Sequence, residues 1–239
     1  MEELKYFELA NKLNKDLSSE LISNNLHFRG NRNSFSLISL DKSTPEIGIG
    51  NLKTIKNATN KFFELIGKPG YKKRKLTKGR ETREKELQAW IIRNALNNKN
   101  KLFFDNQIKF LTSELSLILE DKNKGISKRV VTDILGLNGK DELVIIELKS
   151  SRDKTRLTKQ IENFSKAVKQ NKKFVRGIVD LLTNRKWNGE IEKIIVWPES
   201  SKKEKLVWDH DIKELNYVEV QRGKKKHIKY DEEENVIFK

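Results

Sequence analysis

Apolar positions in the first third of the chain alternate between helical and strand-like spacing. Residues 2–24 predict an amphipathic helix, and residues 27–50 predict short strands and turns from their alternation and their Gly, Asn and Pro residues. A second helix is expected from apolar residues that share one face, and glycine and proline after residue 66 end it. That face is formed by Leu52, Ile55, Ala58, Phe62 and Leu65. We expect residues 1–78 to form an N-terminal module, for which the pattern gives no role.

The remainder predicts a different order of elements. Residues 81–98 carry one apolar helical stripe, and 107–121, 129–137 and 142–149 are strand-like. Residues 154–184 are helical, and 190–198 form a further strand that ends at a proline. We therefore expect an α/β (α+β) fold with a mixed sheet flanked by helices over residues 79–200. Residues 201–239 predict a C-terminal hairpin extension that packs on this core.

The two strands around "NGKDE" allow two registers. Asn138-Gly139 is a strong turn signal, and it is compatible with a loop of two residues or with a loop over 138–142. With the longer loop, Asp133 lies directly opposite Glu147, with β-carbons about 5.5 Å apart. With the shorter loop the two carboxylates do not face each other. In both registers Lys149 leaves the same face as Glu147.

Composition points to a polyanionic partner. The chain has 50 Lys and Arg against 34 Asp and Glu, a formal net charge of +16. Such an excess favours nucleic acid before an anionic membrane, although a generally basic solvated surface would give the same count. Without cysteine the chain has no disulfide, thiolate metal site or cysteine nucleophile. No apolar stretch is long enough to cross a bilayer and the N-terminus is unlike a signal peptide, so a cytoplasmic location is expected.

Two carboxylates that face each other near a core repel unless a cation lies between them. Hard divalent cations prefer such oxygen ligands, and Lys149 could supply part of the positive charge. The alternative is a structural ion cluster of Asp133, Lys149 and Glu147 at the edge of the sheet. Residue types alone leave both interpretations open.

An aspartate, a hairpin and Glu-x-Lys at the end of an apolar strand resemble the PD-(D/E)xK nuclease superfamily, with its restriction-endonuclease-like core. The residues are Asp133 and Glu147-Leu148-Lys149, and Thr132 stands where the family usually has proline. A glutamate on the preceding helix resembles the family's Holliday-junction resolvases. Glu84 lies on the apolar stripe that must face the sheet, whereas Glu86, the fallback, lies well away from it. Gln160, four residues before an aromatic residue, is similar to the glutamine of the RecB-like branch.

The resemblance implies a metal-dependent nuclease that hydrolyses DNA phosphodiester bonds, with an endonuclease favoured. Mg²⁺, or Mn²⁺ in its place, would be held by Asp133, Glu147, the main-chain carbonyl of Leu148, and Glu84. Lys149 would position or deprotonate the attacking water, or stabilise the phosphorane, and Gln160 would contact substrate or orient Lys149. Restriction, defence, repair and recombination all use this fold. Cutting of both strands by an enzyme with one site per chain would favour a homodimer.

Basic residues on both sides of the site are the expected contacts to the DNA backbone. One group follows the site and the other lies near the end of the N-terminal module: Arg152, Lys154, Arg156 and Lys159, and Lys72, Lys73, Arg74 and Lys75. A solvated linker is an equal interpretation of the second group. The competing functions are a non-catalytic nucleic-acid-binding module, and an RNase or structure-selective resolvase.

Overall fold

The computed structural model describes residues 2–40, 49–67, 82–96, 108–121, 125–151, 154–200 and 211–239. Within them the chain forms six α-helices, a short 3₁₀ helix (Glu2–Leu4) and ten strands. The helices are α1 (Lys5–Asp16), α2 (Ser18–Ser23), α3 (Ile55–Ile66), α4 (Thr82–Leu96), α5 (Lys154–Gln170) and α6 (Lys172–Thr183). The strands are β1 (Leu26–Gly30), β2 (Phe35–Ser39), β3 (Ile49–Leu52), β4 (Lys109–Asp121), β5 (Ile126–Leu137), β6 (Leu143–Leu148), β7 (Ile191–Pro198), β8 (Ile212–Tyr217), β9 (Glu219–Arg222) and β10 (Lys225–Ile228).

A five-stranded mixed sheet is the centre of the fold, in the order β4-β5-β6-β7-β8. Strand β5 is antiparallel to both β4 and β6, and β7 and β8 run parallel to β6. Parallel neighbours need a crossover connection, which α5 and α6 provide between β6 and β7. The expected mixed α/β architecture is thus confirmed.

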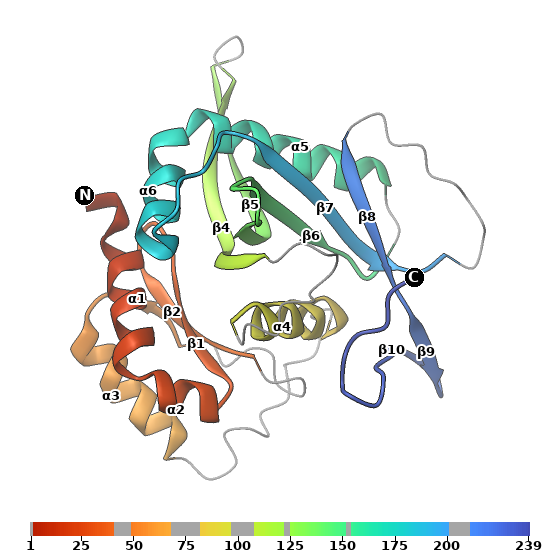
Figure 1. Ribbon diagram of the computed structural model, residues 1–239, viewed down its shortest axis with the longest axis horizontal. Coiled ribbons are helices and arrows are strands. Elements are labelled where there is room, and N and C mark those ends of the chain that lie inside the picture. Colours follow the sequence, from red (N-terminus) through yellow and green to blue (C-terminus); the bar gives the residue numbers. More distant parts are fainter. Residues whose placement is uncertain are drawn as a thin grey trace.

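Helices cover both faces of this sheet (Figure 1). On one face, Leu135 and Ile145 pack in a core with residues of α5 and α6. On the other face, Ile134 and Ile146 pack in a second core with residues of α4. Because β6 is covered on both sides, all six of its residues are buried, which explains its uninterrupted apolar run before Glu147.

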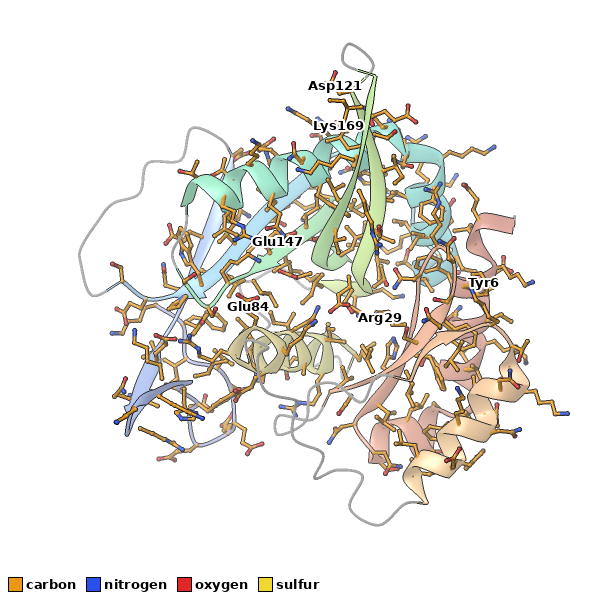
Figure 2. The ribbon with its side chains drawn as sticks, turned by 180° about the vertical axis from the view of Figure 1, so that it is seen from behind. Tyr6, Arg29, Glu84, Asp121, Glu147 and Lys169 are labelled. Atoms are coloured by element: carbon orange, nitrogen blue, oxygen red, sulfur yellow. The ribbon has the colours of Figure 1, made fainter. Side chains whose placement is uncertain are left out.

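The N-terminal module has its own sheet, β1-β2-β3, and its own core around Phe28, Phe35 and Phe62. It is joined to the large sheet at β4, where Thr112 Oγ1 donates to the carbonyl of Gly30 over 2.9 Å. Arg29 of β1 donates to Ser113 Oγ over 3.1 Å, and Figure 2 shows this arginine at the junction. The module therefore packs against the edge of the large sheet.

Two boundaries differ from the sequence prediction. The expected helix over 2–24 is divided at Leu17, whose φ of −116° is not helical. Leu52 was predicted on a helical face but belongs to β3. The helix α3 begins only after Thr54, whose hydroxyl caps it by accepting the amide of Asn57.

The C-terminal residues contain a strand that the sequence pattern did not reveal. The expected hairpin is present as β9 and β10. Before it, β8 pairs in parallel with β7 and becomes the fifth strand of the large sheet, so the sheet extends beyond residue 200. None of the described helices is long and apolar enough to cross a membrane.

Candidate active site

The β5–β6 hairpin has the register that brings the carboxylates together. Leu137 pairs with Leu143 and Ile134 pairs with Ile146, so the loop is the longer one, 138–142. The buried side chain of Asn138 holds this loop, because its Oδ1 accepts the amides of Lys140 and Glu142. The two-residue loop is therefore excluded, and Asp133 and Glu147 are the next facing positions after the last pair.

The two strands separate at this point. The β5–β6 pairing ends at Ile134 and Ile146, and the Leu148 amide donates to Asp133 Oδ2 over 2.7 Å. A side-chain carboxylate thus accepts a β6 amide at the position where the ladder ends. This arrangement holds the Asp133 carboxylate at the carboxyl end of β6, next to Glu147.

Glu147 is a fully buried carboxyl group with an incomplete set of partners. Its side chain is 0% exposed, and Oε2 accepts the side-chain amide of Gln160 on α5. Oε1 has no hydrogen-bond partner among the described residues. Burial, followed by the charge of Asp133, raises the pKa of Glu147 well above its ordinary value of 4.5, and Lys149 opposes this rise only in part. A cation at Oε1 would restore the ionised form.

Lys149 directs its ammonium group at three oxygen atoms at once. Nζ lies 2.7 Å from the carbonyl oxygen of Leu148, 3.7 Å from Asp133 Oδ2 and 3.9 Å from Glu147 Oε2. The backbone of Lys149 is fixed as well, since its amide donates to Val196 of β7 and its carbonyl accepts the hydroxyl of Tyr217. Three of the four predicted metal ligands therefore surround one positive charge.

The fourth predicted ligand, Glu84, lies at the same end of the sheet but contacts a different residue. Its Oε1 accepts the amide and the hydroxyl of Ser150, over 2.9 and 3.1 Å. Figure 2 shows Glu84 on α4 and Glu147 on β6 near one another at this end. Glu86 accepts instead the hydroxyl of Tyr230 in the C-terminal segment, 2.8 Å away. Of the two glutamates, Glu84 is the one beside the Glu-x-Lys segment.

Gln88 is a site residue that sequence reasoning missed. It is buried on α4, one turn after Glu84, and donates to the main-chain carbonyl of Asp133 over 2.8 Å. The signal was a glutamine within the apolar run "LQAWII", since a buried amide needs a partner.

Tyr217 was missed because β8 was missed. Gln160 contacts Glu147, and the expected contact to Lys149 is not among those of the described residues.

The predicted DNA contacts are only partly within the described residues. Arg156 and Lys159 are exposed on the first turns of α5, and the backbone of Lys154 begins that helix. The side chain of Lys154, and Arg152, Lys72, Lys73, Arg74 and Lys75, lie outside the residues that the structure describes.

The oxygen atoms at this site fit a hard divalent cation with a sparse protein ligand set. In the part of the chain that the structure describes, no three His, Cys, Asp or Glu side chains group closely enough to hold an ion. Two carboxylates and the Leu148 carbonyl do converge, and one buried carboxylate oxygen lacks a partner. Mg²⁺ suits such a set because it usually retains several waters and uses one or two carboxylates.

Comparison with models of known protein families, with curated proteins and with solved structures found no match for this chain.

Proposed function

We propose that the protein is a metal-dependent nuclease that hydrolyses phosphodiester bonds of DNA, with a restriction-endonuclease-like core. The observation that carries this proposal is the convergence of Asp133, Glu147 and the Leu148 carbonyl on one cationic position at the carboxyl end of β6. The formal charge of +16 supports a polyanionic substrate.

Asp133, Glu147 and the Leu148 carbonyl would hold Mg²⁺, with Glu84 reaching it through water. When bound, the ion supplies polarisation of the scissile phosphate and a water of lowered pKa. Gln160 keeps Glu147 oriented through its hydrogen bond to Oε2. Gln88 does the same for the backbone of Asp133. Supporting contacts of this kind fix the geometry of metal ligands.

Lys149 supplies a positive charge next to the reacting phosphate. In hydrolysis a bond forms between the water oxygen and phosphorus, the phosphorus–oxygen bond to the sugar breaks, the water gives up a proton to solvent, and the departing sugar oxygen takes up a proton from solvent. Negative charge grows on the phosphorane oxygens, and a fixed ammonium group next to them lowers the barrier. Because Lys149 is partly exposed, at 21% of its side-chain surface, its ammonium can turn from the carboxylates toward a phosphate.

The test is cleavage of supercoiled plasmid, linear duplex and RNA in Mg²⁺ or in EDTA. We expect wild type to cut DNA in Mg²⁺ only, and Glu147→Gln and Lys149→Ala each to lower the rate by about 10²-fold or more. The matched controls are Glu8→Gln and Lys61→Ala, which change exposed residues of the N-terminal module. Wild-type cutting that survives both site substitutions would overturn the assignment of the site.

A non-catalytic nucleic-acid-binding protein is the second candidate. It is favoured by the position of Lys149, whose ammonium already compensates both carboxylates as a structural ion cluster would. Tight, salt-sensitive binding without cleavage of any substrate would select this function. Cleavage of RNA in preference to DNA would select an RNase.

A further inference from the structure

Strands β9 and β10 form a two-stranded ribbon outside the five-stranded sheet. Arg222 pairs with Lys225, so the turn consists of Gly223 and Lys224. Gly223 has a φ of 60°, which a tight hairpin turn requires and which glycine adopts without strain. Figure 1 shows the ribbon projecting beyond the end of β8, on the side of the molecule away from the N-terminal helices.

The ribbon is strongly cationic and exposed. Residues 219–229 contain five basic side chains and one acidic one, Glu219. The basic residues, all exposed, are Arg222, Lys224, Lys225, Lys226 and Lys229. Lys226 pairs with Glu219 at 3.2 Å while 62% of its side chain stays exposed. The other four make no side-chain hydrogen bond or ion pair within the described parts of the chain, so their charges face solvent.

The ribbon begins at the same end of the large sheet as the candidate active site. Strands β6, β7 and β8 are parallel, so their carboxyl ends lie together. Lys149 follows β6, and the ribbon follows β8 after one residue. Two strand spacings of about 4.8 Å separate Lys149 from Asn216, the level position on β8, by about 10 Å, and the ribbon begins three residues further along the chain.

Two side-chain contacts tie the base of the ribbon to the site. The hydroxyl of Tyr217, the last residue of β8, donates to the Lys149 carbonyl over 3.2 Å. Arg83 forms an ion pair with Glu219 at the start of the ribbon, and the next residue of α4, Glu84, holds Ser150. The orientation of the ribbon relative to the site is therefore fixed at its base.

We propose that this ribbon is a binding surface for the backbone of duplex DNA, and that it holds phosphates beside the one that is cleaved. The inference rests on the proposed function, because the site defines where the duplex runs. The major groove of B-form DNA admits a two-stranded ribbon, and the phosphates that line it match the exposed cations. The major groove of A-form RNA is too narrow and deep for side chains to read.

An acidic turn over 231–234 follows the ribbon and offers a competing role for it. The carbonyl of Glu234 accepts the indole N–H of Trp90 over 3.2 Å, so the turn packs against α4 about two helical turns beyond Arg83. The acidic turn is thus displaced along α4 from the end that holds Ser150. It could, however, receive the ribbon of a second copy of the chain, and self-association is therefore included in the test.

The experiment compares wild type with the triple variant Lys224→Gln, Lys225→Gln and Lys226→Gln. Binding to a 30-base-pair duplex in EDTA is measured from about 50 to 300 mM salt. Three lost phosphate contacts lower the slope of log affinity against log salt by about 2.7, which is about a 10²-fold loss near 0.15 M. The matched control is Lys15→Gln, Lys56→Gln and Lys61→Gln, which removes three exposed charges from the N-terminal module. We expect wild-type affinity and slope for the control, and unchanged unfolding temperatures for both.

Four outcomes would contradict the inference. Equal slopes of log affinity against log salt in the ribbon variant and the control would overturn it. Plasmid cutting by wild type in that case would show that the proposed function still stands. If wild type neither binds nor cuts DNA, both proposals fail. A ribbon variant that keeps its DNA affinity but loses a dimer in sedimentation assigns the ribbon to the acidic turn of a second copy. If the ribbon variant loses as much or more affinity for double-stranded RNA as for duplex DNA, the ribbon is assigned to RNA binding.

Discussion

Replacing Glu147 with glutamine removes a carboxyl group whose ionisation the fold opposes. The side chain is 0% exposed, its Oε1 has no partner among the described residues, and the nearest cation, Lys149 Nζ, is 3.9 Å from Oε2. Glutamine has the same shape, and its side-chain oxygen can still accept the hydrogen bond from Gln160. The substitution Glu147→Gln therefore removes the titration and keeps the packing.

The direction of the pKa shift fixes how the free energy of unfolding changes with pH. The unfolded chain loses this proton near the ordinary pKa of 4.5, whereas burial and Asp133 raise the pKa in the folded protein. Below 4.5 both states hold the proton, and the group costs nothing. As the pH rises from 4.5 toward the folded-state pKa, only the unfolded state gains by ionising. The free energy of unfolding of wild type then falls by about 1.4 kcal/mol per pH unit.

Urea unfolding in EDTA across this pH range measures the effect. We expect Glu147→Gln to become more stable than wild type by about 1.4 kcal/mol for each pH unit above 4.5, until the difference levels off. Taking the difference between the two proteins cancels the titration of the groups that do not interact with Glu147. Glu8→Gln, an exposed residue on α1, is the control and should follow wild type.

Mg²⁺ should stabilise wild type and narrow its difference in stability from Glu147→Gln. An ion present at 100 times its dissociation constant stabilises the folded state by about 2.7 kcal/mol. For a protein of this size that is a rise of roughly 5–10 °C in the unfolding temperature of wild type. Glu147→Gln should show little of this rise. Parallel stability curves of the two proteins in EDTA would refute the argument from burial, and an unchanged wild-type unfolding temperature in Mg²⁺ would refute the metal site.

Two further substitutions test the contacts that support the site, and a pair of glycine substitutions tests the packing of the N-terminal module. Gln160→Ala removes a donor to the buried carboxylate, so the Mg²⁺ concentration for half-maximal cleavage should rise about 10- to 100-fold; an unchanged metal requirement would contradict this. Gln88→Leu leaves a β5 carbonyl without its donor and should lower the free energy of unfolding by about 1–3 kcal/mol in urea titrations. Gly30→Ala puts a β-carbon 2.8 Å from the backbone of Phe7 and should cost about 1–3 kcal/mol, whereas Gly139→Ala, with open space around it, should unfold like wild type.

Sequence periodicity was sufficient for most elements because each buries a face whose spacing is set by local backbone geometry. The stripe that includes Leu87 and Trp90 predicted α4, and the same stripe selected Glu84 as the glutamate facing the sheet. That choice depends only on helical spacing, and the contact between Glu84 and Ser150 agrees with it. Residues 142–149 were likewise predicted as a strand, and burial on both faces explains the uninterrupted apolar run of β6.

Periodicity could not identify β8 or its partner. Its buried positions, Ile212, Leu215 and Tyr217, are separated by charged and polar residues, as in a strand at the edge of a sheet. Parallel pairing with β7 joins segments that are not neighbours in the sequence, and no local pattern encodes it. The hydrogen bond from Tyr217 to Lys149 was therefore also beyond a sequence-based prediction.

The sequence alone placed one carboxylate on the first strand of the hairpin, and a carboxylate and a lysine on one face of the second. The spacing of side chains along a strand is fixed, so this needs no tertiary structure. Only the tertiary structure decided whether they meet. The loop over 138–142 set the register, the departure of β5 from β6 placed Asp133 on the Leu148 amide, and α5 brought Gln160 to Glu147. Burial by distant segments is what raises the pKa of Glu147, and desolvation of this kind depends on the packed fold and not on the order of residues.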